Sequence, residues 1–455
     1  MEKIVKIASG QGFWGDLPSA PVSQVKQGDV DYLMMDYLAE VTMSIMQKQK
    51  LKRPDAGYAR DFVEVVRSIF PEIKQGKVKV VSNAGGVNPH ACKDAILKAA
   101  EEEGVSGFKV AVVDGDDILE QISELTDAGH ELKNMDTGQP ITDISDDLLS
   151  ANVYFGADPV VKALEAGADV IITGRVTDTG LCLGPMIYEF GWSMEDYDKM
   201  AAGTVAGHIL ECGAQSSGGN YTDWKEIDNF AEIGFPIVEA TPDGNFIVAK
   251  HEKTGGIINL KSIKEQLLYE IGDPADYITP DCVADFTSIQ LDQKEKSRVQ
   301  VYGIKGSAPT DFYKVSASYK YGYKLSATLV YSWPDALEKA KSASEILKKR
   351  ADNLGLKLDD YRTEYIGFNG CSEEPMSEDV IKSDFNEIQL RVSAASSSRQ
   401  DLDRLGREVA PLILTGPSSV TGFAGGRPKA SEVVAYWPAL IKKEACTPQV
   451  NIYQA

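Results

Sequence analysis

Residues 169–178 read Asp-Val-Ile-Ile-Thr-Gly-Arg-Val-Thr-Asp, and this stretch decides the fold class. Three branched apolar residues stand in a row from Val170 to Ile172 without alternation, so they predict a strand that is buried on both faces. Residues 158–166, which precede the strand, are predicted to be helical. A helix followed by a fully buried strand is typical of a parallel sheet that helices cover on both sides.

The same alternation extends through the first half of the chain. The elements predicted there are strands at residues 4–8, 77–82 and 108–113, and helices at residues 31–49 and 89–103. We therefore predict an α/β domain over residues 1–235, with a mostly parallel sheet flanked by helices. Such sheets bind ligands beyond the carboxyl ends of their strands, so the loops at those ends are the candidate site.

The second half of the sequence has a different pattern, because several of its segments alternate apolar and polar residues. The elements predicted there are antiparallel strands at residues 299–303, 311–319 and 323–332, a further strand at 387–394, and helices at 334–351 and 400–414. This order predicts a second, α+β domain of split βαβ type over residues 236–455. Residues 446–455 are predicted to be a C-terminal tail.

Composition and charge limit the classes of function. The chain has 455 residues, of which 43% are hydrophobic and 25% charged, as in an ordinary globular protein. We expect a cytoplasmic protein, because no apolar run is long enough to span a bilayer, no signal peptide is recognisable and the six cysteines are scattered. A formal net charge of −21 disfavours binding to nucleic acid and to anionic membranes.

Gly10-Gln-Gly-Phe-Trp-Gly15 matches the dinucleotide pattern G-x-G-x-x-G directly after the first predicted strand. That pattern requires a helix to begin at the glycines, whereas Pro18 and Pro21 follow here. We therefore expect no nicotinamide or flavin binding by this loop. It is interpreted as a substrate-lining loop with Asp16 as a polar member, and the alternative is a set of ordinary turn glycines.

Two further loops follow predicted strands. In residues 83–90, Asn83, Gly85, Gly86 and Asn88 are candidates for substrate binding, because paired glycines let backbone N–H groups converge on an anion. The alternative is a tight turn between a strand and a helix. In the loop after residue 173, Arg175 provides a permanent cation and Asp178 a base, unless the two form a structural ion pair.

The segment 203–219 combines chemistry-bearing residues with glycines. If residues 203–212 are helical, His208 and Glu211 share one face and form a candidate acid–base pair. The alternative is a buried histidine that a helix partner satisfies. Two such residues do not make a metal site, so no metal is expected. The substrate-binding candidates that follow in this segment are Gln215, Gly218 and Gly219.

A glycine-rich loop near the C-terminus carries two cations. Gly425, Gly426, Arg427 and Lys429 are predicted to hold an anionic part of the substrate, because flexible backbone donors and positive side chains occur together in an otherwise acidic chain. The alternative is an ordinary solvated loop.

Together these blocks resemble the acyclic terpene utilisation A (AtuA) family. The stretches that carry the resemblance are residues 9–16, 36–40, 83–89, 113–117, 166–178, 183–185, 203–219 and 421–428. The family is named for the catabolism of terpene-derived acyl-CoA esters, which implies an acyl-CoA substrate. Longer relatives often continue into a small ferredoxin-like domain that opens with Arg-Ser-Gly-Asp-Lys-Gly, a motif this sequence lacks. The resemblance therefore implies that a separate small subunit supplies that part or that this chain acts alone.

From these observations we predict an enzyme that acts on a small carboxylate or an acyl-CoA thioester by acid–base chemistry, with hydration or dehydration as the favoured reaction. The alternatives are a non-catalytic scaffold or ligand-binding subunit of a two-subunit complex, and an acyl-CoA hydrolase or lyase that uses Cys212. We expect a homo-oligomer and no cofactor, apart from coenzyme A as part of the substrate.

Overall fold

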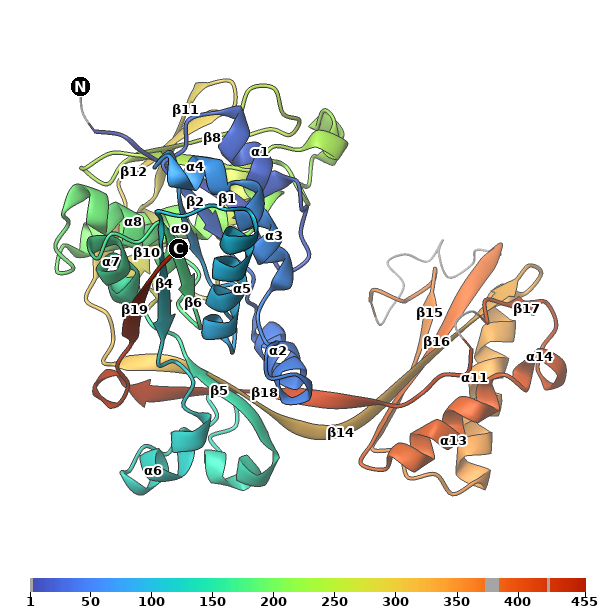
Figure 1. Cartoon of the computed structure of the whole chain (residues 1–455). Coiled ribbons are helices and arrows are strands. Elements are labelled where there is room, and N and C mark those ends of the chain that lie inside the picture. The colour runs from blue at the N-terminus through green and yellow to red at the C-terminus, as the bar shows by residue number, and fades with distance from the viewer. Residues whose placement is uncertain (1–2, 373–383, 424–425) are drawn as a thin grey trace. The chain divides into compact units, whose positions relative to one another are not determined.

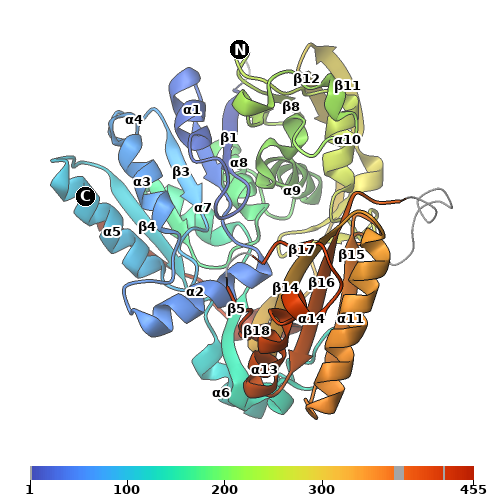
Figure 2. The same cartoon turned by 90° about the vertical axis from the view of Figure 1, so that its right-hand side faces the viewer.

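The computed structural model describes residues 3–372, 384–423 and 426–455 (Figures 1 and 2). The chain forms two compact units: unit 1 is Met1–Ser318 with Tyr436–Ala455, and unit 2 is Tyr319–Ala435. This division differs from the boundary near residue 235 that the sequence suggests. The reason is that the segment 237–302 adds four antiparallel strands to the sheet of unit 1.

Unit 1 is built on a ten-stranded mixed sheet. In sheet order its strands are β11 (Gln290–Glu295), β12 (Arg298–Tyr302), β8 (Phe246–Ala249), β7 (Ile237–Ala240), β1 (Val5–Gln11), β2 (Tyr32–Met35), β3 (Lys79–Ser82), β6 (Val170–Thr173), β4 (Lys109–Asp114) and β19 (Gln449–Gln454). The five strands from β1 to β4 are parallel, which confirms the predicted α/β class.

Helices cover both faces of this sheet. In Figure 2, α3 and α5 lie on one side of the parallel strands and α8 and α9 on the other. The helices of unit 1 are α1 (Ala20–Gln27), α2 (Glu40–Lys52), α3 (Arg60–Ser68), α4 (Phe70–Lys74), α5 (Pro89–Glu102), α6 (Ile122–Asp127), α7 (Asp158–Glu165), α8 (Gly180–Phe190), α9 (Tyr197–Glu211) and α10 (Leu260–Leu268). Because β6 is covered from both sides, Val170, Ile171 and Ile172 are fully buried, as their sequence predicts.

Two sequence-based expectations are wrong in unit 1. Residues 32–35 form strand β2 rather than the start of a helix, and α2 begins only at Glu40. Four consecutive apolar residues fit a fully buried strand as well as a helix, so periodicity alone cannot separate the two. The predicted C-terminal tail contains β19, which pairs with β4 and completes the sheet at that edge.

Unit 2 has the predicted split βαβ arrangement. Its sheet has the order β15-β16-β14-β17, with β16 antiparallel to both of its neighbours. Its own elements are α11 (Ala336–Asn353), β15 (Asp360–Ile366), β16 (Glu387–Ser396), α13 (Arg399–Val409), α14 (Leu412–Thr415) and β17 (Val420–Thr421). Two long strands, β14 (Phe312–Ser332) and β18 (Ser431–Lys442), belong to unit 2 only within Tyr319–Ala435 and otherwise to unit 1. The inner faces of β14 and β16 pack against α11 and α13 in a hydrophobic core of their own.

The remaining strands are short elements of unit 1. They are β5 (Leu148–Val153), which pairs with β14, and β9 (Tyr277–Ile278), β10 (Val283–Asp285) and β13 (Lys305–Ser307), which form a three-stranded sheet. Among the described residues, no helix is both long and apolar enough to cross a membrane.

Because each unit has its own hydrophobic core, shortening a core side chain in one unit should destabilise that unit and not the other. Ile172→Ala should destabilise unit 1 by about 2–5 kcal/mol, because it removes a fully buried side chain and leaves a cavity, whereas Leu390→Ala should destabilise unit 2 by a similar amount. Hydrogen exchange read by mass spectrometry reports the strands of each unit. The expectation fails if either variant speeds exchange equally in β3 and β16.

Candidate active site at the carboxyl ends of the parallel strands

A cavity of about 430 Å³ lies in unit 1, where β1, β2 and β6 end. The end of α9 and the segment after α10 close it on the other side. Its lining residues are Gly12, Phe13, Asp36, Leu38, Ala39, Arg175, Asp178, Glu211, Cys212, Gln215, Tyr269 and Glu270. Polar groups from strands that are distant in the sequence therefore meet at one edge of the sheet, as the parallel arrangement predicts.

An amide joins two of the carboxyl groups. Asn83, fully buried at the end of β3, donates from Nδ2 to Asp36 Oδ1 at 2.6 Å and to Asp178 Oδ1 at 3.4 Å. Its own Oδ1 accepts the backbone N–H of Tyr37 at 2.7 Å. Asn83 therefore fixes the positions of both carboxyl groups, although it does not line the cavity itself.

Arg175 provides the positive charge of the site. Its guanidinium donates from Nη1 to Asp178 Oδ1 at 2.8 Å and from Nη2 to Asp178 Oδ2 at 3.2 Å. Nη1 also donates to the carbonyl of Leu38, and the guanidinium lies 4.1 Å from the ring centre of Tyr154. Burial disfavours its charge, but the nearby acidic groups, with Asp178 first, raise the pKa of Arg175. The predicted Arg175–Asp178 pair thus forms within the cavity.

The environments of Asp36 and Asp178 differ. Burial, followed by the charge of Asp178, raises the pKa of Asp36 well above its usual value, although Arg175 opposes the shift. The raised pKa favours the protonated form of Asp36. Asp178 instead faces the fork of Arg175, an arrangement that suits an ionised carboxylate.

A second buried acid, Asp116, does not line the cavity itself. Asp116 Oδ2 accepts the backbone N–H of Arg175 and Nδ2 of Asn152, each at 2.8 Å. Burial raises the pKa of Asp116 to about 6. Through these bonds Asp116 holds the backbone from which the Arg175 side chain extends.

The predicted His208–Glu211 pair forms on α9, with Nδ1 of the imidazole 2.8 Å from Glu211 Oε1. The other ring nitrogen, Nε2, lies 2.8 Å from the carbonyl of Gln266 and must donate to it. Burial opposes the charge on His208, but Glu211 and Gln266 raise its pKa above the usual value. His208 is 2% exposed and does not line the cavity, whereas Glu211 does. The geometry therefore makes His208 a positioning residue for Glu211.

Cys212 lines the cavity beside Glu211 but is poorly suited to nucleophilic chemistry. Burial, and then the charge of Glu211, raises the pKa of its thiol to about 12. Because the thiolate is the reactive form, the thiol is a weak nucleophile at neutral pH.

In the predicted loop of residues 10–16, some residues line the cavity and others hold the loop in place. Gly12 lines the cavity, and a side chain there would meet the backbone of Gly213 at 2.6 Å, so this close approach requires glycine. Asp16 lies outside the lining; its carboxylate accepts the N–H of Gly12 at 3.0 Å and that of Leu17 at 2.7 Å. The next helix, α1, begins only at Ala20.

Other predicted binding residues have structural contacts instead. Gly85 and Gly86 are buried, and a side chain at Gly85 would meet the carbonyl of Thr173 at 2.5 Å. Asn88 donates to the carbonyls of Pro54 and Ala56, and so holds that loop.

In the segment after α9, too, only some of the predicted binding residues line the cavity. Gln215 lines the cavity, whereas Gly218 and Gly219 do not. Gly218 has a φ of +108° and packs closely on Ile227.

The predicted anion loop belongs to unit 2. Gly426, Arg427 and Lys429 line a separate hollow of about 370 Å³ together with Ser326 and Thr328. Both cations are exposed. Gly425, predicted as part of the same loop, lies outside the described residues.

Several lining residues were not singled out as site residues from the sequence, namely Phe13, Asp36, Tyr269 and Glu270. For Asp36 the sequence does contain a signal, because this residue directly follows a short apolar run; that run fits the start of a helix as well as the strand that it forms. Tyr269 and Glu270 come from the end of α10, far along the chain, and no local pattern marks them.

Comparison with known families settles the family. The model described as acyclic terpene utilisation family protein AtuA matches residues 5–452. The chain belongs to the AtuA family. No curated protein and no solved structure matches the chain. Within the part of this AtuA chain that the structure describes, no group of three or more His, Cys, Asp or Glu residues is arranged to hold a metal ion.

The His208–Glu211 pair predicts a pH-dependent stability. Because folding raises the pKa of His208, its contribution is fully present below about pH 6.5 and is lost as the pH rises through the raised value. Free energies of unfolding measured across this range should therefore differ most between wild type and His208→Gln at the acidic end. His130→Gln is the control. A constant difference between wild type and His208→Gln would contradict the assignment.

Proposed function

We propose that this AtuA-family chain is an acid–base enzyme that adds water to, or removes water from, an acyl thioester, with Asp36 as the acid and Asp178 as the base. The observation that carries the proposal is the contrast between these two carboxyl groups, which share Asn83 and yet have opposite environments. Two titratable groups whose surroundings shift their pKa values in opposite directions are typical of acid–base catalysis.

The reaction needs one proton removed and one delivered. In the dehydration direction, Asp178 takes the proton from the carbon next to the thioester carbonyl, and Asp36 gives its proton to the departing hydroxyl group, which leaves as water. Transfer of the proton from Asp178 back to Asp36 through solvent restores the starting state. Glu211, held by His208, faces the same cavity and orients the substrate hydroxyl by accepting its proton in a hydrogen bond.

The charge of the cavity favours a thioester over a small carboxylate. Four carboxyl groups line it, namely Asp36, Asp178, Glu211 and Glu270, and Arg175 is the one cation among the lining residues. The Arg175 guanidinium already forms bonds with Asp178 and Leu38. A free carboxylate would meet repulsion there, whereas the acyl end of a thioester is uncharged.

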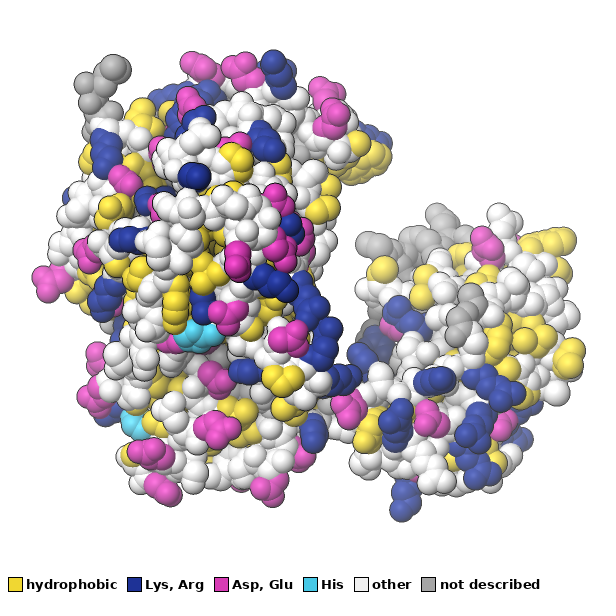
Figure 3. All heavy atoms as spheres, viewed as in Figure 1, with side chains coloured by type: hydrophobic (Ala, Val, Ile, Leu, Met, Phe, Trp, Pro, Cys, Tyr) yellow, Lys and Arg dark blue, Asp and Glu magenta, His cyan; other side chains and the backbone are white. Residues whose placement is uncertain are grey.

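Independently of the acidic cavity, the loop with Arg427 and Lys429 in unit 2 carries exposed cations, and we assign to it the binding of an anionic group such as a phosphate of coenzyme A. Most of the net negative charge of the sequence falls on unit 1, so unit 2 is closer to neutral. Figure 3 shows Lys and Arg side chains gathered on the visible face of unit 2.

The direct experiment is to incubate the protein with a panel of enoyl- and hydroxyacyl-CoA thioesters and to follow gain or loss of water by mass spectrometry. Turnover of at least one thioester is expected. Saturable binding without turnover of any of them would contradict the proposal and would support a ligand-binding subunit instead.

Asp36→Asn and Asp178→Asn should each lower turnover by about 10²–10⁴-fold, because each removes one of the two proton-transfer groups. Activity of the wild type should fall as the pH rises through the raised pKa of Asp36, because only the protonated acid can donate. Asp127→Asn, at an exposed carboxylate outside the cavity, is the matched control. Near-normal turnover in both folded site variants would place the chemistry elsewhere.

Arg427→Ala should weaken binding of coenzyme A by about 1.5–3 kcal/mol, because it removes a charge-assisted hydrogen bond. Calorimetric titration of the full chain measures this change. Arg404→Ala, at an exposed arginine on α13, is the matched control for the loss of one positive charge from unit 2. Equal affinities of wild type and Arg427→Ala would show that the loop has only a structural role.

A further inference from the structure

The ten-stranded sheet of unit 1 ends at two edge strands, β11 and β19. An edge strand presents backbone N–H and C=O groups that no further strand covers, and soluble proteins protect such edges with charged side chains and bulges. β11 is protected in both ways, because Asp292, Lys294 and Glu295 are charged and its register shifts between Gln293 and Glu295. β19 reads Gln-Val-Asn-Ile-Tyr-Gln, and its pairing with β4 is regular. The β19 edge therefore has neither charges nor a bulge to protect it.

The open edge of β19 is formed by the backbone of alternate residues. The N–H of Ala455 donates to the carbonyl of Phe108 at 3.0 Å and continues the ladder between β19 and β4. Ladder bonds alternate along an antiparallel pair, so every second residue counted back from Ala455 bonds to β4. The N–H and C=O groups of Val450, Ile452 and Gln454 therefore point outward. Among the described residues, none forms a hydrogen bond with these outward backbone groups.

The side chain of Ile452 is also open to solvent. Tyr453, the next residue, lies against α5, where the amine of Lys93 is 4.2 Å from the centre of its ring. Because side chains alternate along a strand, Ile452 points to the opposite face of the sheet. It is 38% exposed there. The edge of β19 thus combines open backbone groups with an exposed apolar side chain.

We propose that β19 is the surface through which two copies of this chain join, as antiparallel strands related by a two-fold axis at Ile452. In this register Ile452 faces its own counterpart, and Val450 faces Gln454 of the second copy. Each outward N–H then meets an outward C=O, so the two sheets continue into one.

The backbone pattern selects this register over its neighbours. An axis at Asn451 would place Gln454 opposite Pro448, which has no N–H to donate. An axis at Tyr453 would place the residue opposite Val450 beyond the end of β19. Only the axis at Ile452 pairs all three outward residues within the strand.

Two observations favour a second copy over an unrelated strand as the occupant. The chain has a formal net charge of −21, so two copies repel each other as they approach. An uncharged strand is the part of the surface at which this approach costs least. The pairing also covers the exposed side chain of Ile452 with an identical apolar side chain, which contributes to the stability of a sheet.

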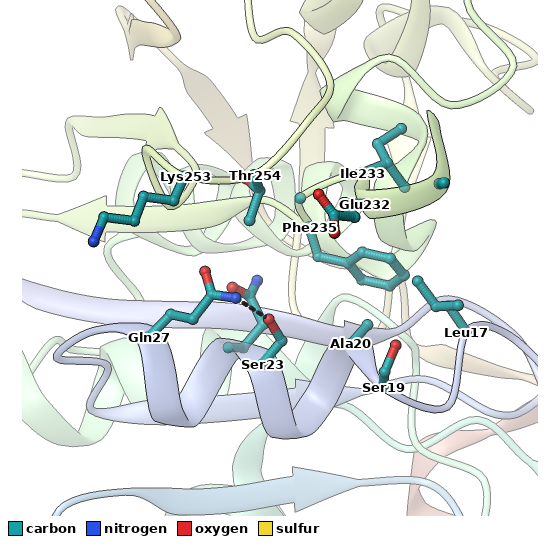
Figure 4. A pocket seen from close by; sticks show the side chains of 13 residues that line it. Leu17, Ser19, Ala20, Ser23, Gln27, Glu232, Ile233, Phe235, Lys253 and Thr254 are labelled. Atoms are coloured by element: carbon teal, nitrogen blue, oxygen red, sulfur yellow. Dashed lines mark hydrogen bonds between the residues drawn. The ribbon is translucent and has the colours of Figure 1, made fainter. Parts of the chain in front are cut away.

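A hollow of about 260 Å³ elsewhere in unit 1 offers a weaker surface for contact between copies. It lies between α1 and the segment that precedes β7 (Figure 4). Glu232 and Lys253 line it and are exposed, and Gln27 already donates to Ser23 Oγ at 2.6 Å. Contact between copies there would bury charged groups, which is costly unless they are paired. The uncharged edge of β19 has no such cost.

The direct test is a disulfide between two copies of the full chain. Facing residues of a hydrogen-bonded antiparallel pair have Cα atoms about 5.5 Å apart, a separation that a disulfide can span. Ile452→Cys should therefore form a covalent dimer under copper–phenanthroline oxidation, in a Cys371→Ser background that removes an exposed native thiol. Denaturing electrophoresis without reductant measures the product.

Gln454→Cys in the same background is the matched control. Residue 454 faces residue 450 of the second copy, so two copies of Cys at position 454 would lie four residues apart, about 13 Å along the strand. This variant should stay uncrosslinked, whereas the double variant Val450→Cys, Gln454→Cys should crosslink. Crosslinking of Gln454→Cys as readily as of Ile452→Cys would overturn the proposed register.

The mass of the protein in solution provides an independent test. Light scattering coupled to size exclusion should give twice the mass of one chain for the wild type. Ile452→Lys should give the mass of one chain, because it places two like charges face to face across the axis. Gln290→Lys, at an exposed position of β11, is the control and should remain dimeric. A wild type with the mass of one chain, or a folded Ile452→Lys protein that remains dimeric, would overturn the proposal.

Discussion

The buried guanidinium of Arg175 is the constraint on which the candidate site depends. A charge that is 2% exposed is costly unless it is paired and hydrogen-bonded, so its partners must lie close to it. The carboxylate of Asp178, the carbonyl of Leu38 and the ring of Tyr154 meet that requirement. Because these partners come from different parts of unit 1, the ends of β2 and β6 must stay in register for the charge to be tolerated.

The same cation also explains the unequal carboxyl groups. One guanidinium makes a bidentate contact with Asp178, and Asp36 is left with an amide and a backbone N–H as its partners. Burial, and then the charge of Asp178, raises the pKa of Asp36, so the carboxyl group without the guanidinium contact is the one that favours its protonated form. The contrast between the two carboxyl groups thus depends on the burial of Asp36 and on the single guanidinium that Asp178 engages.

The sequence predicts the parts of this arrangement that depend on local pattern. Val170 to Ile172 indicate a buried strand without any tertiary information, and the spacing of His208 and Glu211 indicates their shared face. The sequence does not predict Asp36 as a site residue, because Tyr32–Met35 is apolar at every position and only burial in the sheet decides between strand and helix there. The carbonyl of Gln266, which occupies the second nitrogen of His208, lies 58 positions along the chain, and no local pattern could place it.

The enclosure of the cavity lined by Asp36, Asp178 and Glu211 depends on a glycine at position 12. Gly12 lies so close to the backbone after α9 that any side chain would separate the two segments. Moving them apart would open the cavity that Gly12 and Asp36 both line, and would admit water to Asp36. Because burial is the first cause of the raised pKa of Asp36, added water would lower that pKa and remove the difference between the two carboxyl groups. We therefore expect the close approach at Gly12 to support the raised pKa of Asp36, at the end of the neighbouring strand, although the two residues exchange no proton.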